Sequence, residues 1–336
     1  MARERCVVVG AGGISNAWFP PLAKEKVQVA AVVDLRPEAA EAQVKKYELK
    51  AEVTADLKAA LAKHRPDFVL DLTVPEAHCD VTCTALKAGC HVIGEKPMAS
   101  SMAEARTMVK AADEAGRLYM VSQSRRWDAR HLSVQRTVPR IGSLTTINCD
   151  FYLGAHFGGF RDAMPSPLIL DMSIHHFDLC RFMTGVDPLA VYCKEFNPKG
   201  SWYEGDVAAS AIFEMSNGVI FTYRGSWCAE GCHTSWNGDW RFIGTKGTLL
   251  YDHDQEPRGE AVVGKEGFHR DKEPVTVAKP RVKFGGMHGG LREMLAFLRT
   301  GLMPQTECHD NIKSLAMVFA AIESNKQGKR VPVRAL

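Results

Sequence analysis

The chain lacks long apolar segments and has only a small excess of positive charge. No hydrophobic run approaches the roughly 18 residues that a membrane-spanning helix needs. The short apolar stretch after the basic start runs directly into glycines, so we do not expect a secretory signal there. The formal net charge of +3 is too small to predict binding to nucleic acid or to a membrane surface. These features together predict a cytoplasmic protein.

Cysteine patterns typical of zinc sites are also scarce. The 10 cysteines are scattered, and none forms a paired C-x-x-C framework. The nearest candidate is Cys228 with Cys232, followed by His233, but the second ligand pair of a zinc site is missing. We therefore expect loop and strand residues there rather than metal ligands. Several other cysteines lie in apolar segments, where a free thiol behaves as a small hydrophobe, and we expect the thiols to be reduced.

The length of 336 residues exceeds what one hydrophobic core usually serves, which predicts two domains. Up to about residue 123, short apolar strands alternate with helix-like segments, a pattern typical of a doubly wound parallel sheet. The strands are expected at 5–9, 27–35, 66–75, 91–97 and 118–123, and the helices at 37–47, 54–63, 77–88 and 101–116.

After residue 123, strand-like segments follow one another without intervening helices. Asn217-Gly218 lies between two of them and is a strong hairpin signal, so we expect an antiparallel meander with one or two helices. Residues 252–290 are rich in charge, glycine and proline, which predicts loops with at most a short strand. Two apolar-periodic helices are expected at 289–300 and 310–327.

The first strand ends in a glycine-rich turn. Gly10, Gly12 and Ser15 occupy the three small-residue positions of G-x-G-x-x-G, between a valine strand and an expected helix. The first glycine permits a tight turn, and the second lets the backbone approach a pyrophosphate, which would face the N-terminus of the helix. The loop, including Gly13 and Ile14, therefore predicts dinucleotide binding.

Asp34 ends the second strand and follows Gly10 by 24 residues. A carboxylate at this position accepts hydrogen bonds from the adenosine ribose hydroxyls and repels a 2′-phosphate, which favours NAD. Arg36 lies two residues further on, where a guanidinium can instead pair with that phosphate. We therefore expect NAD as the cofactor, with NADP as the alternative.

Glu95-Lys96-Pro97 directly follows the fourth strand. In open α/β sheets, ligands bind outside the carboxyl ends of the strands. A lysine ammonium at this edge can stabilise the negative charge that develops on a reacting hydroxyl. A Lys-Pro pair in a turn is also common on protein surfaces, so this segment alone does not establish a site.

The segment LILDMSIHHFDLC contains two adjacent histidines between two aspartates. In a helix over 169–184, Asp171 and His175 share a face, whereas His176 is rotated from His175 by about 100°. Asp178 would offer secondary polar support. The pattern leaves three readings open: a structural histidine pair, an acid–base site of Asp171 and His175, or a metal site that includes His176.

The chain resembles the Gfo/Idh/MocA oxidoreductases in five segments, which read VVVGAGGIS, VVDLRPE, LTVPEAH, KAGCHVIGEKPMA and LILDMSIHHFDLCRFMTG. The resemblance implies a Rossmann domain over 1–123. It also implies a substrate-binding and oligomerisation α/β domain over 124–336, with a large, open, mainly antiparallel sheet. In this family the sheet commonly buries one face between subunits, which implies a homodimer or homotetramer.

The resemblance also assigns catalytic roles. The lysine of E-K-P falls on Lys96, and the aspartate and histidine of D-x-x-x-H fall on Asp171 and His175. The implied reaction transfers a hydride between the nicotinamide and a carbinol carbon of a sugar, inositol or related polyol. Two alternatives remain: an NAD-dependent glycosidase or epimerase with transient redox chemistry, and a dinucleotide-binding regulator without activity.

The remaining candidates surround the two expected ligands. We expect these residues to contact the cofactor: Thr73, Pro75, His78 and Glu95. We expect these to contact the substrate: Arg126 or Trp127 in the segment 122–128, His156 in the glycine-rich loop 154–162, and Trp236. The alternative for His156 is a loop residue that faces water, and tryptophans of antiparallel sheets are more often core or interface residues.

Overall fold

The computed structural model describes residues 3–336, which divide into two compact units. The first unit runs up to Ser124 and includes Phe284–Ile312 and Leu336; the second consists of Arg125–Lys283 and Lys313–Ala335. The expected boundary after residue 123 lies beside Ser124. Residues 284–312, however, were expected in the second domain and belong to the first unit.

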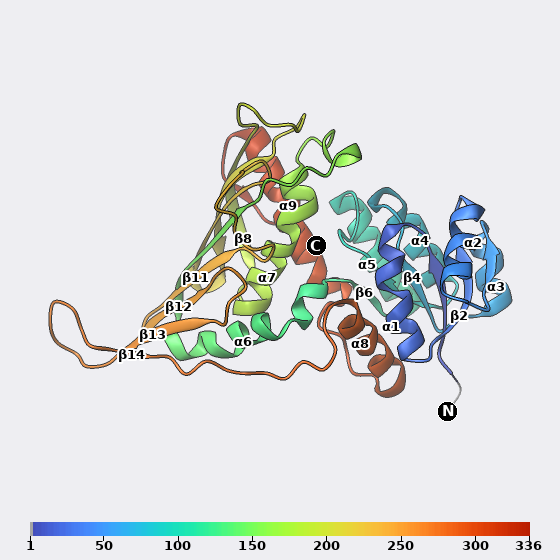
Figure 1. Ribbon diagram of the computed structural model, residues 1–336, viewed down its shortest axis with the longest axis horizontal. Coiled ribbons are helices and arrows are strands. Elements are labelled where there is room, and N and C mark those ends of the chain that lie inside the picture. The colour runs from blue at the N-terminus through green and yellow to red at the C-terminus, as the bar shows by residue number, and fades with distance from the viewer. Residues whose placement is uncertain (1–2) are drawn as a thin grey trace. The chain divides into compact units, whose positions relative to one another are not determined.

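The first unit contains a six-stranded sheet in which every paired neighbour is parallel (Figure 1). Its order is β3-β2-β1-β4-β5-β6, the order of a Rossmann sheet. The strands are β1 (Arg5–Val9), β2 (Gln28–Val33), β3 (Glu52–Thr54), β4 (Phe68–Asp71), β5 (His91–Gly94) and β6 (Tyr119–Val121). The predicted doubly wound parallel sheet is therefore confirmed.

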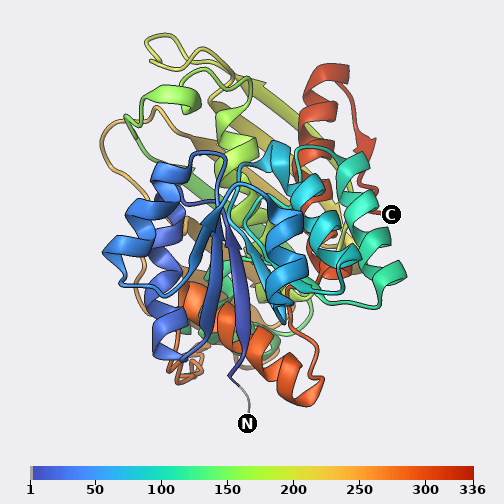
Figure 2. The same ribbon diagram turned by 90° about the vertical axis from the view of Figure 1, so that its right-hand side faces the viewer.

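Helices cover both faces of this sheet (Figure 2). They are α1 (Phe19–Lys24), α2 (Pro37–Lys46), α3 (Leu57–His64), α4 (Pro75–Lys87) and α5 (Met102–Ala115). The strands β1, β2 and β4 are almost entirely buried because helices lie on both sides, which explains their unbroken apolar runs. Strand β3 escaped prediction because it is a three-residue edge strand without a recognisable pattern.

Helix α8 (Gly286–Thr300) explains why residues 284–312 belong to the first unit. His288 and Arg292 both bind Glu25 at the end of α1, at 2.7 and 3.0 Å. Arg299 binds Glu4 at 2.6 Å. The apolar side of α8 is buried at Leu291, Met294 and Leu295. The sequence did not indicate that the chain returns to the first unit, because the paired residues are more than 260 positions apart.

The second unit contains a nine-stranded sheet of order β14-β13-β12-β11-β7-β10-β9-β8-β15. The strands are β7 (Leu144–Tyr152), β8 (Pro188–Phe196), β9 (Ala208–Met215), β10 (Ile220–Ser226), β11 (Asp239–Gly244), β12 (Gly247–Tyr251), β13 (Arg258–Val262), β14 (Lys272–Pro274) and β15 (Val331–Pro332). All paired neighbours are antiparallel except the pair formed by β7 and β10, which is parallel. The hairpin predicted at Asn217-Gly218 joins β9 to β10.

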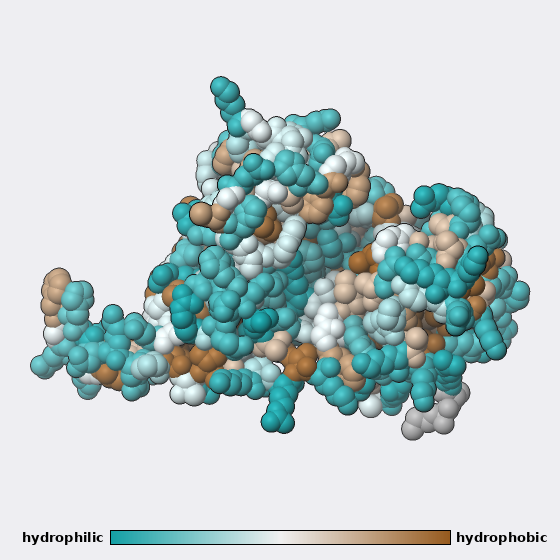
Figure 3. Space-filling model, viewed as in Figure 1, coloured by the Kyte–Doolittle hydropathy of each residue, from teal (hydrophilic) through white to brown (hydrophobic). Residues whose placement is uncertain are grey.

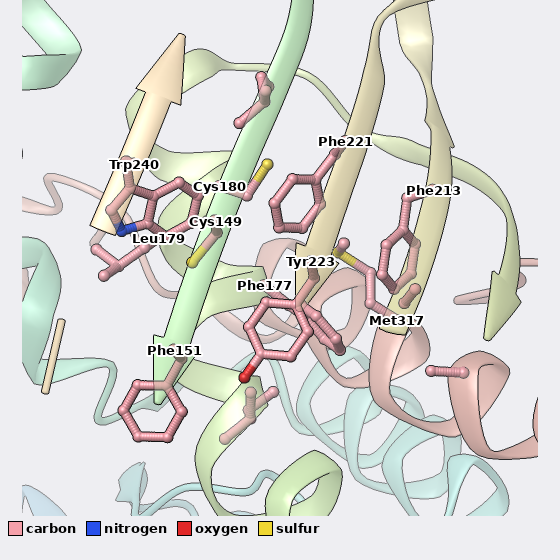
Figure 4. Close-up of a cluster of buried hydrophobic side chains, with 14 of the residues drawn as sticks. Cys149, Phe151, Phe177, Leu179, Cys180, Phe213, Phe221, Tyr223, Trp240 and Met317 are labelled. Atoms are coloured by element: carbon pink, nitrogen blue, oxygen red, sulfur yellow. The ribbon is translucent and has the colours of Figure 1, made fainter. Parts of the chain in front are cut away.

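The sheet and two helices enclose an aromatic core (Figure 4). Helix α7 (Ile174–Thr184) contributes Phe177, and α9 (Cys308–Gln327) contributes Met317. The sheet contributes Phe213, Phe221 and Trp240, among others, and the rings of Phe221 and Trp240 stack at 5.9 Å. Helix α6 (Ala129–Thr137) adds Val134 to the same core. Burial of these large rings accounts for much of the stability of this unit.

The segment 252–290 is more ordered than we expected. It contains two strands, β13 and β14, joined by a loop that carries Phe268, which is 98% exposed. We call β13, β14 and the loop between them the arm. Figure 3 shows a hydrophobic patch at the end of this arm. The strands are short, and β14 is fully exposed, so neither shows the alternating pattern from which strands are predicted.

No helix within residues 3–336 is long and apolar enough to cross a membrane. All 10 cysteines are free. Cys228 and Cys232 lie in the segment that follows β10. The Ser226 hydroxyl at the end of β10 contacts Cys228 Sγ at 3.4 Å.

Glu195 on β8 is a buried acid whose ionisation affects stability. Its side chain is 1% exposed, and burial raises the pKa of its carboxyl to about 7, with a further contribution from Asp206. The folded protein therefore holds a proton that the unfolded chain releases above pH about 4.5. The free energy of unfolding should fall by about 3 kcal/mol between pH about 4.5 and about 7 through this group.

Glu195→Gln should remove that loss and leave the variant more stable than the parent at pH 8. Urea denaturation of both proteins at pH 5 and pH 8 measures the effect. Glu204→Gln, which changes an exposed carboxylate of the same unit, serves as the control. An equal pH dependence in the parent and in Glu195→Gln would contradict the assignment.

Candidate functional site

The glycine loop after β1 has the backbone that a pyrophosphate-binding turn requires. Gly10 has φ +95°, and a Cβ there would lie 2.6 Å from the carbonyl oxygen of Leu72. At Gly12 and Gly13, by contrast, a Cβ would meet nothing within 4 Å. Gly10 is thus required by the fold itself, whereas Gly12 and Gly13 have open space beside them.

This contrast separates two substitutions. Gly10→Ala should destabilise the protein, because the left-handed φ and the clash with Leu72 both oppose a side chain. Gly12→Ala should leave stability nearly unchanged but weaken NAD binding at least tenfold, since the methyl group occupies the open space. Thermal unfolding and NAD titration by fluorescence measure the two effects. Equal NAD affinity in Gly12→Ala and the parent would show that no phosphate approaches this loop.

The helix expected after the loop does not begin directly at the glycines. A 3-10 turn (Gly13–Ala17) comes first, and α1 follows with Pro20 and Pro21 in its first turn. Ser15, at the third small-residue position, is fully buried and donates its hydroxyl to the carbonyl of Gly12 at 2.7 Å. Ile14 is 37% exposed. Ser15 therefore meets the packing requirement for a small residue at this position.

Asp34 lies just beyond β2, next to the glycine loop. Its Oδ2 accepts a hydrogen bond from the backbone N–H of Ala11 at 2.8 Å, and its Oδ1 accepts one from the N–H of Arg36. The Arg36 side chain is 70% exposed, with Nε 3.9 Å from the same carboxylate. The structure therefore brings Asp34 and the glycine loop together, as the dinucleotide motif predicts.

The turn after β4 is held by a buried acid. Asp71 accepts hydrogen bonds from the Thr73 hydroxyl at 2.6 Å and the Thr82 hydroxyl at 3.0 Å, and burial raises the pKa of its carboxyl. His78 was expected to contact the cofactor, but it is fully buried and bonds the Thr73 carbonyl at 3.1 Å. His78 therefore supports the turn from within. Thr73 and Pro75 remain partly exposed.

Glu95 is likewise buried rather than available to a ligand. Trp18 donates its indole N–H to Oε1 at 2.9 Å, and the backbone N–H of Lys96 donates to Oε2 at 3.2 Å. Burial raises the pKa of Glu95, and it is 6% exposed. Its expected contact with the cofactor is thus replaced by a structural role. Lys96 itself is partly exposed at the carboxyl end of β5, before a cis bond to Pro97.

In the second unit, the segment that carries Asp171 and His175 is not one regular α-helix. A π-helical turn (Leu168–Ser173) precedes α7. The buried Ser173 hydroxyl bonds the Leu168 carbonyl and the Tyr223 hydroxyl, both at 3.0 Å. Such π-turns within helices are frequent at functional sites. Asp171 and His175 are both partly exposed, whereas the intervening residues are buried.

Asp171 pairs with a residue that sequence reasoning missed. Arg161 donates from Nε to Asp171 Oδ2 at 2.6 Å. Its guanidinium also lies over the rings of Phe157 and Phe160, at 5.0 and 4.7 Å from their centroids. The basic residue between two aromatics and an acid in FGGFRD was the available signal. The loop 154–162 therefore reaches the aspartate of the expected acid–base pair.

His176 is a buried packing residue, as helical geometry suggested. It is fully buried, and Tyr223 and the carbonyl of Trp236 lie 3.4 Å from its two nitrogens. Burial lowers its pKa well below the usual histidine range. It is therefore neutral at physiological pH, and its environment differs from that of the partly exposed His175.

Arg126 and Trp127 do not face a ligand in this structure. Arg126 is 4% exposed and forms a bidentate ion pair with Asp178, at 2.8 and 2.6 Å. Trp127 is 6% exposed. Their contact with the substrate stays a prediction. Asp178, expected to support His175, instead neutralises Arg126.

The neighbouring Arg125 is the cation that sequence reasoning passed over. Its Nη1 donates to the carbonyl of Trp236 at 2.7 Å, and its Nη2 lies 3.9 Å from Met172 Sδ. Met172 follows Asp171 directly. Adjacent arginines in the short 3-10 turn Ser124–Trp127 project in different directions, so the sequence alone did not distinguish them.

The two remaining substrate candidates are exposed. His156 stacks on Trp202 with ring centroids 3.7 Å apart, and its Nε2 lies 2.9 Å from Glu230. Trp236 is 46% exposed and lies 6.1 Å from the ring of Phe157. Trp236 therefore lies near the loop that pairs with Asp171, whereas His156 is engaged with Trp202 and Glu230.

Comparison with known proteins identifies the family. The description "Oxidoreductase family, NAD-binding Rossmann fold" matches residues 4–123, and "GFO/IDH/MocA C-terminal domain" matches residues 102–250. An uncharacterised protein of Sinorhizobium fredii is 27% identical, over 97% of this chain and 94% of that protein. D-apiose dehydrogenase of Paraburkholderia graminis is also 27% identical, over 84% of this chain and 76% of the relative.

The fold is shared with solved structures. An oxidoreductase from Agrobacterium radiobacter, crystallised with NAD⁺, L-tartaric acid and magnesium, superposes with a TM-score of 0.86 at 20% identity and covers 99% of both chains. The two matched domains together extend from residue 4 to residue 250, and they agree with the Rossmann strand order and the large, mainly antiparallel sheet. The chain therefore belongs to the Gfo/Idh/MocA oxidoreductases and carries their NAD-binding Rossmann domain.

Proposed function

We propose that the protein oxidises a carbinol group of a sugar or polyol, or reduces the corresponding carbonyl, with NAD(P). The observation that carries this proposal is the partly exposed Asp171 and His175 at a π-helical turn, in a chain whose other unit presents the dinucleotide loop. Relatives named as sugar and polyol dehydrogenases, such as D-apiose dehydrogenase, support the substrate class.

His175 is proposed as the general base. In the oxidation direction it takes the proton of the substrate hydroxyl, and in the reduction direction it returns a proton to the carbonyl oxygen. Lys96 is proposed to stabilise the negative charge on that oxygen. Asp171, held by Arg161, orients the imidazole and the substrate. The nicotinamide, when bound, accepts or supplies the hydride.

The cofactor is proposed to be NAD, with NADP as a weaker alternative. Gly10, Gly12 and Gly13 would hold the pyrophosphate, and Asp34 the ribose hydroxyls. The carboxylate of Asp34 lies beside the glycine loop, where it would repel a 2′-phosphate. Arg36, with its exposed side chain, would permit some binding of NADP.

A substrate screen tests the proposal. Aldoses, alditols and inositols are offered with NAD and with NADP, and reduction of the nicotinamide is followed by absorbance. We expect at least one carbinol substrate, with NAD preferred. Exchange of substrate deuterium without accumulation of NADH would instead indicate transient redox chemistry, as in a glycosidase or epimerase. Failure of every substrate in both tests would contradict an enzymatic role.

A second copy of the chain is the proposed partner. The sheet face opposite α7 and α9 exposes apolar side chains on three adjacent strands: Leu189, Tyr192 and Phe196 on β8, Ile212 on β9 and Ile220 on β10. Tyr192 and Ile212 are directly paired across β8 and β9. Exposed large apolar side chains gathered on neighbouring strands are typical of a subunit interface. Light scattering in solution would give the subunit number.

A further inference from the structure

Arg125 is a cation without a carboxylate at ion-pair distance among the residues that the structure describes. Its two described contacts are a neutral carbonyl, that of Trp236 at 2.7 Å, and the sulfur of Met172 at 3.9 Å. Within residues 3–336, no carboxylate lies within ion-pair distance of its guanidinium. Its two contacts use only part of the five N–H donors that a guanidinium carries.

Three other arginines of this unit each form an ion pair with a carboxylate. Arg126 binds Asp178 at 2.6 Å, Arg161 binds Asp171 at 2.6 Å, and Arg181 binds Asp187 at 3.0 Å; each thus has its own carboxylate.

The carboxylate that most affects Arg125 is already engaged elsewhere. Asp254 accepts hydrogen bonds from the Asn237 amide and the Tyr251 hydroxyl, both at 2.8 Å. Burial nevertheless lowers the pKa of Arg125 to about 10, which keeps it charged at physiological pH. A partly desolvated cation without a counter-ion is costly, so an external anion gains by binding there.

The position of Arg125 connects it to the proposed reaction site. Met172, which it contacts, directly follows Asp171 in the π-turn. The carbonyl of Trp236 accepts from Arg125 and also lies 3.4 Å from His176, the residue after His175. The guanidinium therefore lies beside Met172 of the π-turn and the backbone of Trp236.

We propose that the substrate is a hydroxy acid, such as a uronic or aldonic acid, and that Arg125 binds its carboxylate. This inference rests on the proposed function and narrows its substrate class. A guanidinium offers a carboxylate two parallel N–H donors, which fixes orientation as well as adding affinity. The carboxylate of the substrate supplies the charge that no side chain within residues 3–336 supplies at ion-pair distance. A neutral sugar leaves the cation uncompensated.

The test compares acids with neutral counterparts of the same configuration. D-glucuronate is compared with D-glucose, D-galacturonate with D-galactose, and D-gluconate with D-glucitol, all at saturating NAD. Binding is measured by tryptophan fluorescence, and kcat/KM by nicotinamide absorbance. At least one acid should bind or react about 10- to 100-fold better than its neutral counterpart, and added salt should reduce that preference.

Variants of Arg125 assign the preference to this side chain. In Arg125→Gln, the ratio of kcat/KM (or affinity) for the acid to that for its neutral counterpart should fall at least tenfold. Arg125→Lys should keep part of this preference. Arg136→Gln removes an exposed positive charge from α6 of the same unit and serves as the matched control. Circular dichroism confirms that each variant is folded.

The outcomes separate this inference from the proposed function. If a neutral polyol is oxidised and no acid is preferred, the carboxylate inference fails while the proposed function stands. If acids bind through Arg125 without hydride transfer, the carboxylate-binding role of Arg125 stands and the proposed function fails. If no acid of the panel binds, or if Arg125→Gln lowers acid and neutral binding by the same factor, Arg125 only positions Trp236 and the inference is overturned.

Discussion

Replacing His175 by alanine should lower kcat about 10²–10⁴-fold, the contribution typical of a positioned general base. The affinity for NAD should stay within about twofold of the parent value, because the glycine loop and Asp34 belong to the first unit and His175 to the second. Steady-state turnover on the substrate identified by screening measures the first effect, and NAD titration measures the second.

The matched control is His269→Ala, which removes an exposed histidine from the loop between β13 and β14. It should leave kcat and NAD affinity unchanged. Unchanged turnover in His175→Ala would remove the acid–base assignment. A joint loss of turnover and NAD binding would indicate misfolding rather than chemistry, and circular dichroism of the variant distinguishes the two.

Asp178→Ala should destabilise the protein by about 3–5 kcal/mol, the cost of leaving a buried charge without its partner. Asp178 and Arg126 are 1% and 4% exposed and form a bidentate pair. The same carboxylate accepts a hydrogen bond from the Ser314 hydroxyl at 2.8 Å, which in turn accepts one from Arg181 at 2.9 Å. One substitution therefore disrupts a connected network, and urea denaturation measures the loss.

Two comparisons define the origin of this loss. The double variant Arg126→Met with Asp178→Leu should lose much less stability, because it removes both charges and keeps the volume apolar. Asp150→Ala breaks the pair with Arg224, whose side chain is 56% exposed, and should cost at most about 1 kcal/mol. If Asp178→Ala were no less stable than Asp150→Ala, the buried network would contribute nothing to folding.

Much of the fold followed from short-range patterns. The strand positions of the first unit were predictable because helices bury both faces of the sheet, so that each inner strand reads as an apolar run. The glycine motif and Asp34 were predictable because the dinucleotide turn imposes steric conditions on single residues, and Gly10 meets the strictest of them. Short edge strands such as β3 and β14 carry no such signal.

The site was predictable in its residue types but less so in their contacts. Glu95 and His78 fit the family pattern, yet each is buried and supports a turn. Arg126 and Arg125 are adjacent, and only the tertiary structure shows that the first pairs with Asp178 while the second contacts no carboxylate of residues 3–336. Sequence distance is a poor guide here because the partners come from other elements.

By itself, the sequence determined the parallel sheet and the glycine turn of the first unit. These features depend on the periodicity of neighbouring residues and on the steric demands of single positions. Only the tertiary structure decided that α8 belongs to the first unit, that Arg161 holds Asp171 and that Arg125 lies beside the same turn. Those features depend on which segments and charged side chains meet after folding, and these come from distant parts of the chain.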